Sequence, residues 1–62
     1  MKMMEWIKCT ERLPSISTTV LGYTTYIVFA EFDEDGWVEI PYFWEIHPSH
    51  WMPLPEAPKG EE

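Results

Sequence analysis

The sequence predicts a mainly β domain: a small three- or four-stranded antiparallel meander with irregular N- and C-terminal segments packed on it, and at most one short helical turn. Three observations predict this class. Residues 20–23 and 26–32 are rich in β-branched and aromatic side chains. Residues 33–36 (DEDG) carry the strongest turn signal. Prolines at positions 48, 53, 55 and 58 make regular structure unfavourable near the C-terminus.

The N-terminal part predicts only short elements. Residues 6–9 have the mixed polar and apolar pattern of a short extended segment, with Trp6 as its anchor. Residues 10–14 predict a turn, because Thr10 is a good N-cap and Pro14 prevents a helix from continuing through it. These residues allow at most one helical turn, at residues 10–13, and a polar loop is expected over residues 15–19.

The central part predicts a hairpin. Residues 24–25 lie between the two apolar runs and predict a tight turn, although they lack the Asn-Gly signature of the commonest hairpins. The second run is largely apolar on both faces, with Tyr26, Val28, Ala30 and Phe32 on one and Ile27, Phe29 and Glu31 on the other. A strand of this kind is expected to be central and covered on both sides.

The remaining elements follow from turn and breaker residues. The turn at residues 33–36 predicts a third strand over residues 37–40, which Pro41 ends because it cannot donate to a ladder. Residues 42–46 either extend that strand beyond a kink or start a new one. A short strand is expected near residues 50–52. The whole chain is expected to be one domain, residues 1–62, with a frayed start at residues 1–5 and a solvated tail at residues 59–62.

The short length of the chain limits how much stability its core can supply. A 62-residue chain buries only about 60% of its unfolded surface, so it needs a further source of stability. Cys9 is the single cysteine, which excludes a disulfide within the chain. Four Trp, three Tyr and three Phe suggest that aromatic packing is that source, with dimerisation as the alternative.

The net charge of the chain and its expected compartment exclude some classes of partner. The net charge of −7 argues against direct binding to nucleic acid, which requires a basic face. No apolar run approaches the roughly 20 residues that span a bilayer, so no membrane association is expected. A lone cysteine and no signal-like start predict a reducing cytoplasm. The acidic residues around the predicted turn either keep the protein soluble or attract a basic partner, and the latter surface could mimic nucleic acid.

Three parts of the sequence form a recognisable pattern: residues 6–14 (WIKCTERLP), then Val20, Leu21 and Trp37, and finally residues 49–58 (SHWMPLPEAP). Over residues 6–58 the chain resembles the family known as domain of unknown function 551, whose members are short and occur mainly in bacteriophages and prophages. The usual C-terminal signature is THWMPLP, and this chain has Ser49 in place of the threonine, which keeps the hydroxyl. The resemblance implies a phage-encoded accessory protein in the host bacterial cytoplasm, and it supplies no activity and no catalytic residues.

The signature at residues 50–55 has a structural and a functional interpretation. Structurally, its prolines fix an extended path and Trp51 closes the core against Trp6, while His50 bonds to backbone or to Ser49. Functionally, Trp6, His50 and Trp51 form a shallow aromatic site for a peptide or a flat ligand, since such residues are enriched at binding hot spots. The sequence favours the structural interpretation and leaves the site open.

Other chemistry is weakly supported. His47, His50 and Cys9 are too few, and the two histidines too constrained by Pro48, to predict a zinc site. A Cys9–His50 nucleophile and base would lack a third group. The acidic turn of Asp33, Glu34 and Asp35 lacks the spacing of a calcium loop and predicts a solvated hairpin tip. No cofactor and no enzymatic activity are therefore expected.

The sequence thus favours an interaction module over an enzyme. Its expected partner is a host protein that it binds and modulates through Trp6, His50, Trp51 and the acidic residues Asp33, Glu34 and Asp35. A homodimer is a further candidate assembly. Two alternatives stay open, namely a small-ligand-binding module built on exposed aromatics and an acidic mimic of nucleic acid.

Overall fold

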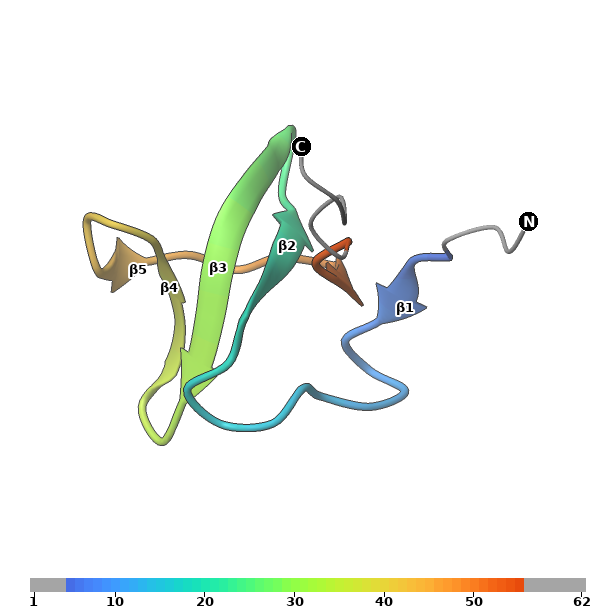
Figure 1. Cartoon of the computed structure of the whole chain (residues 1–62), viewed down its shortest axis with the longest axis horizontal. Coiled ribbons are helices and arrows are strands. Elements are labelled where there is room, and N and C mark those ends of the chain that lie inside the picture. Colours follow the sequence, from blue (N-terminus) through green and yellow to red (C-terminus); the bar gives the residue numbers. More distant parts are fainter. Residues whose placement is uncertain (1–4, 56–62) are drawn as a thin grey trace, which may run out of the picture.

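The described residues form one antiparallel sheet of six strands (Figure 1). The computed structural model describes residues 5–55 of the chain. The strands are β1 (Ile7–Lys8), β2 (Thr19–Tyr23), β3 (Ile27–Asp33), β4 (Gly36–Glu39), β5 (Trp44–Glu45) and β6 (His50–Pro53). Their order across the sheet is β1-β6-β2-β3-β4-β5.

The predicted mainly β, antiparallel class is confirmed, but the number of strands is six where three or four were expected. The two extra pairings come from the segments expected to be irregular. The expected extended segment at residues 6–9 contains β1, and the expected strand near residues 50–52 is β6. Strand β6 pairs with the edge of β2, and β1 pairs with β6, because the edge of a strand offers unpaired backbone donors and acceptors.

The path of the chain departs from a simple meander at β6. Strands β2 to β5 follow one another across the sheet, and β6 then returns to pair with β2 on its other side, with Leu21 opposite Met52. In Figure 1 the connection from β5 to β6 passes behind β3 and β2. Within this connection Pro48 is buried, and it lies 3.6 Å from the position that a Cβ atom on Gly22 would occupy. The connection therefore covers one face of the sheet.

The hairpin between β2 and β3 forms where residues 24–25 predicted it. Its turn spans residues 24–26, with Tyr23 paired to Ile27 at its base. The Thr24 amide donates to the Tyr26 carbonyl at 3.0 Å, and the Thr24 hydroxyl donates to the same carbonyl at 3.2 Å. This threonine replaces the glycine that common hairpin turns use.

The second hairpin, between β3 and β4, is closed by its own acidic residues. Asp33 Oδ1 accepts a hydrogen bond from the Asp35 amide at 2.9 Å, which is an Asx turn. Gly36 has φ of 121°, a backbone conformation that side chains with a Cβ rarely adopt. Strand β4 ends before Pro41, as predicted, and residues 42–46 contain a separate strand, β5.

Residues 10–13 make a turn without a helix. The amides of Glu11 and Arg12 both donate to the Lys8 carbonyl, at 2.8 and 3.3 Å, and this closes a single turn. Residues 5–55 contain no helix long and apolar enough to cross a membrane. Apart from Glu5, the expected frayed start and solvated tail lie outside the described residues.

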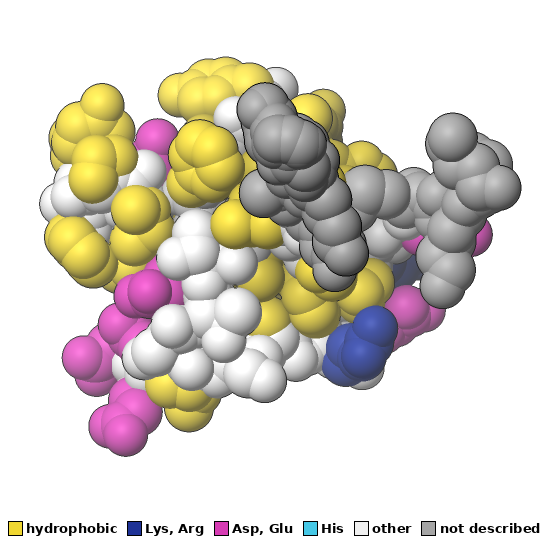
Figure 2. Space-filling view, viewed as in Figure 1, with side chains coloured by type: hydrophobic (Ala, Val, Ile, Leu, Met, Phe, Trp, Pro, Cys, Tyr) yellow, Lys and Arg dark blue, Asp and Glu magenta, His cyan; other side chains and the backbone are white. Residues whose placement is uncertain are grey.

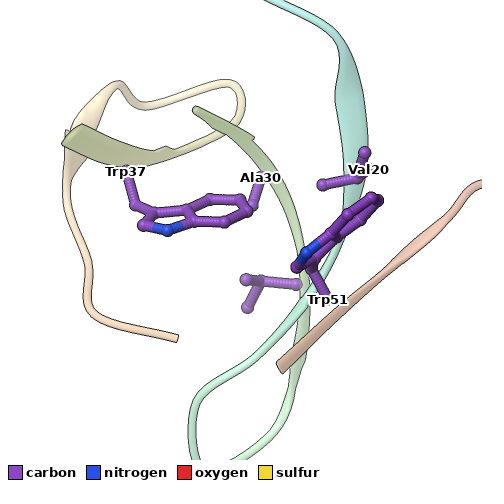
Figure 3. Close-up of a cluster of buried hydrophobic side chains, with 5 residues drawn as sticks. Val20, Ala30, Trp37 and Trp51 are labelled. Atoms are coloured by element: carbon purple, nitrogen blue, oxygen red, sulfur yellow. The ribbon is translucent and has the colours of Figure 1, made fainter. Parts of the chain in front are cut away.

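The core lies on the face that the β5–β6 connection covers. It consists of Val20, Val28, Ala30, Trp37 and Trp51. Figure 3 shows the Trp37 indole extending beneath Ala30 from one side and the Trp51 indole beside Val20 on the other. The two indoles come from β4 and β6, on opposite sides of the β2–β3 hairpin. Half-buried Ile7, Cys9, Phe32 and Ile46 pack against this cluster.

The opposite face, here called the outer face, corrects one prediction. Strand β3 was expected to be covered on both sides, yet Ile27 and Phe29 are 55% and 54% exposed. Of the aromatic residues whose packing was expected to supply stability, Trp37 and Trp51 lie in the core. The physical reason is that the described strands all enter one sheet, and the single crossing connection covers only the core face.

Candidate functional site

Two of the three residues proposed as an aromatic site lie together. Trp6 and His50 line a shallow depression of about 210 Å³, and the third wall is Tyr23. The Trp6 and Tyr23 rings meet edge to face, with centroids 5.9 Å apart and an interplanar angle of 61°. Strand pairing explains the arrangement, because His50 is opposite Lys8 on β1 and opposite Tyr23 on β2.

His50 is held by its neighbour in the chain. Its Nδ1 lies 2.8 Å from the Ser49 hydroxyl oxygen, which is the contact that the structural interpretation of the signature expected. The Ser49 backbone is itself fixed, since its amide donates to the Tyr23 carbonyl and its carbonyl accepts from the Cys9 amide. The imidazole is therefore oriented, and Nε2 is the ring nitrogen left for a ligand.

Trp51 lies on the other face of the sheet, away from this depression. It is 6% exposed and belongs to the core. Its indole N–H donates to the Arg12 carbonyl at 2.9 Å, and the Arg12 guanidinium lies 5.7 Å from its ring centroid. The expected closing partner Trp6 packs on Tyr23 instead. Neighbouring residues of a strand point to opposite faces, so His50 and Trp51 cannot line one surface.

The acidic residues proposed for interaction lie at the tip of the β3–β4 hairpin. The Asp33 carboxylate is used by the turn itself, whereas Glu34 and Asp35 are exposed. Across residues 5–55 no three side chains of His, Cys, Asp or Glu are grouped closely enough to hold a metal ion. The tip offers charge without a preformed site.

The side chains considered for metal binding or catalysis lie in separate surroundings. His47 Nε2 is 3.3 Å from Glu45 Oε2, and both side chains are largely exposed. Burial raises the pKa of the Cys9 thiol above its ordinary value. A higher pKa lowers the thiolate fraction at neutral pH, which is the reverse of what a nucleophilic cysteine requires.

A second aromatic group, which the sequence analysis did not single out, lies on the segment leading into β5. Tyr42 and Trp44 stack with ring centroids 4.5 Å apart and an interplanar angle of 21°. The Trp44 indole N–H donates to Glu39 Oε1 at 2.9 Å. Phe43, between them, has φ of 64° and is 64% exposed. Three consecutive aromatics after a proline were the available signal, because an alternating strand cannot bury all three.

Taken together, seven of the ten aromatic side chains are exposed: Trp6, Tyr23, Tyr26, Phe29, Tyr42, Phe43 and Trp44. Figure 2 shows hydrophobic side chains gathered over the end of the molecule that carries β4 and β5, next to the acidic hairpin tip. Isolated exposed apolar residues are ordinary, whereas gathered apolar surface is more frequent at interaction sites.

The fold and these surfaces define a small β protein that consists of one sheet and exposes many of its aromatic side chains. Comparison with known proteins identifies its relatives. The family described as "Protein of unknown function (DUF551)" matches residues 5–59, and the chain belongs to this family. It is 36% identical to the "Uncharacterized 7.8 kDa protein in ral-gp17 intergenic region" of Salmonella phage P22, over 89% of this chain and 97% of the phage protein. No solved structure gives a significant match.

These comparisons confirm the resemblance that the N- and C-terminal signatures suggested, and they associate the family with phages. The match also includes residues 42–48, which carry none of the signature residues.

Proposed function

We propose that the protein is a phage- or prophage-encoded accessory factor that binds and modulates a host protein in the bacterial cytoplasm. The observation that carries this proposal is the exposed aromatic surface, above all the stacked Tyr42–Trp44 pair on β5 and the segment before it. Tyrosine and tryptophan are the residues that most often dominate protein interfaces, because they bury large areas with few rotatable bonds. A domain this small gains nothing in stability from leaving them in water.

Affinity capture from a host lysate tests the proposal. The full chain is compared with the double variant Tyr42→Ala/Trp44→Ala and with Tyr26→Ala, which removes a tyrosine that is 66% exposed at a different hairpin. We expect one host protein, or one set, to be recovered with the full chain and with Tyr26→Ala but lost with the double variant. Repeated recovery of nothing, or equal recovery with all three, would contradict the proposal.

A small-ligand-binding module is the second candidate, supported by the depression between Trp6, Tyr23 and His50. Its volume of about 210 Å³ is below the roughly 300–1,000 Å³ of ordinary ligand pockets, so it suits only a small planar group. A ligand of this site should raise the melting temperature of the full chain and not that of His50→Ala. A panel of nucleotides and metabolites without any shift would count against this function.

A further inference from the structure

The stacked pair on β5 is fixed together with a carboxylate. Tyr42 and Trp44 are 59% and 56% exposed, so each ring keeps surface open to solvent beyond the face that stacks on the other ring. The Trp44 indole holds Glu39 through Oε1 at 2.9 Å, and Oε2 of that carboxylate accepts no hydrogen bond from the described residues. The Phe43 amide donates to the Glu39 carbonyl at 2.7 Å, which fixes the backbone of the same segment. The two rings and the carboxylate therefore form one ordered group.

Among residues 5–55, the part of the sheet formed by β3, β4 and β5 carries no lysine or arginine. The sequence has no lysine or arginine at any position from 13 to 58. Six acidic residues fall within this stretch on β3, β4, β5 and their turn: Glu31, Asp33, Glu34, Asp35, Glu39 and Glu45. Within residues 5–55 the ion pairing of these acids is limited to Glu45 with His47. No lysine or arginine among residues 5–55 forms an ion pair with these acids, so their charge is available to a basic group of a partner.

We propose that Tyr42, Trp44 and Glu39 form a binding site for an arginine side chain of a protein partner, an inference that rests on the proposed interaction function. A guanidinium is planar, stacks on aromatic rings and donates to a carboxylate at the same time. The ammonium group of lysine is not planar, so it cannot stack on an aromatic ring in the same way. The chain already contains one contact of an arginine with an aromatic ring, since the Arg12 guanidinium lies 5.7 Å from the centroid of the Trp51 ring.

A second copy of the chain fits this surface poorly. Each copy carries a net charge of −7, so two acidic ends would repel each other. The basic residues among positions 5–55 are Lys8 and Arg12, and the latter already covers Trp51. Charge complementarity therefore favours a basic segment of a different protein.

The test uses three acetylated tetrapeptide amides as probes: tetra-arginine, tetra-lysine and tetra-citrulline. Each is titrated into the full chain at low salt while the four indole N–H resonances are followed by heteronuclear NMR. We expect the Trp44 resonance to move most, tetra-arginine to bind several-fold more tightly than tetra-lysine, and tetra-citrulline not to bind. Trp44→Ala and Glu39→Gln should each weaken tetra-arginine by about fivefold, the equivalent of about 1 kcal/mol.

Matched variants separate this site from general attraction to an acidic protein. Glu34→Gln removes the same charge at the exposed hairpin tip, and Tyr26→Ala removes an equally exposed tyrosine elsewhere. Both should leave the affinity for tetra-arginine within about twofold, since neither touches the site. The inference is overturned if arginine and lysine peptides bind equally, or if Glu34→Gln costs as much as Glu39→Gln. Circular dichroism of each variant shows that the sheet is retained.

The outcomes of the peptide and lysate experiments are independent, so either proposal can be contradicted while the other is supported. Host capture that depends on Tyr42 and Trp44 while tetra-arginine does not bind would overturn the arginine site and leave the interaction function standing. Selective binding of tetra-arginine with no host protein captured would support the site and contradict the host-protein function.

Discussion

Trp51 connects the two ends of the chain through a single side chain. It is paired with Ile7 in the sheet, its ring lies in the core, and its indole N–H donates to the Arg12 carbonyl. The hydrogen bond joins residues 39 positions apart. The first and last parts of the family signature therefore meet here, and the tryptophan of that signature is structural.

Two substitutions of Trp51 should distinguish the stability that comes from its packing from the stability that comes from its hydrogen bond. Trp51→Phe keeps an aromatic ring but leaves the Arg12 carbonyl without its donor, and we expect a loss of about 1 kcal/mol in the free energy of unfolding. Trp51→Ala empties the core and should cost about 3–5 kcal/mol, enough to unfold a domain of this size. Trp44→Ala, at an exposed position, should change stability by less than about 0.5 kcal/mol. Urea denaturation measures all three. Equal costs for Trp51→Ala and Trp44→Ala would contradict the assigned core.

Cys9 gives a pH dependence whose sign follows from its burial. Desolvation raises the pKa of the folded thiol above that of the unfolded chain. The resulting stabilisation is complete below the unfolded pKa and is lost as pH rises through the folded pKa. In alkaline solution the wild-type protein should therefore lose more of its free energy of unfolding than Cys9→Ala does. Denaturation curves at neutral and alkaline pH test this, and parallel pH profiles would show that the thiol contributes nothing.

The elements show which parts of the fold are predictable from local chemistry. The β2–β3 and β3–β4 hairpins are local, so composition and the DEDG turn locate both to within about one residue. The position of β6 between β1 and β2 depends on contacts between distant parts of the chain, and no local pattern encodes it. The same limit applies to the site. Trp6 and His50 are recognisable from their signatures, but Tyr23 joins them only through the β6–β2 register.

The β3–β4 hairpin offers a test of backbone conformation without steric interference. A Cβ atom on Gly36 would meet nothing within 4 Å, yet the residue has φ of 121°. Gly36→Ala should therefore destabilise the protein by about 1–3 kcal/mol through backbone strain alone. Thermal denaturation measures this cost. A neutral substitution would mean that the hairpin relaxes into another turn.

The whole molecule divides its charge unevenly along the sheet. The basic residues among positions 5–55 belong to β1 and the turn after it, while six acids lie on β3, β4, β5 and their turn. The sheet order places β1 and β5 at opposite edges. The acidic half also carries the stacked aromatic pair, so repulsion and apolar attraction act on the same surface. Which of the two dominates between copies depends on screening.

Salt should therefore change self-association and arginine binding in opposite directions. Raising the ionic strength from about 0.01 M to 1 M shortens the Debye length from about 30 Å to about 3 Å, which removes the repulsion between copies. We expect a monomer at low salt and self-association at high salt, reduced by Tyr42→Ala/Trp44→Ala because that variant removes apolar area. Binding of tetra-arginine should weaken over the same range. Sedimentation velocity measures the first effect and peptide titration the second. A dimer already present at low salt and lost in the double variant would instead identify the aromatic surface as a homodimer interface.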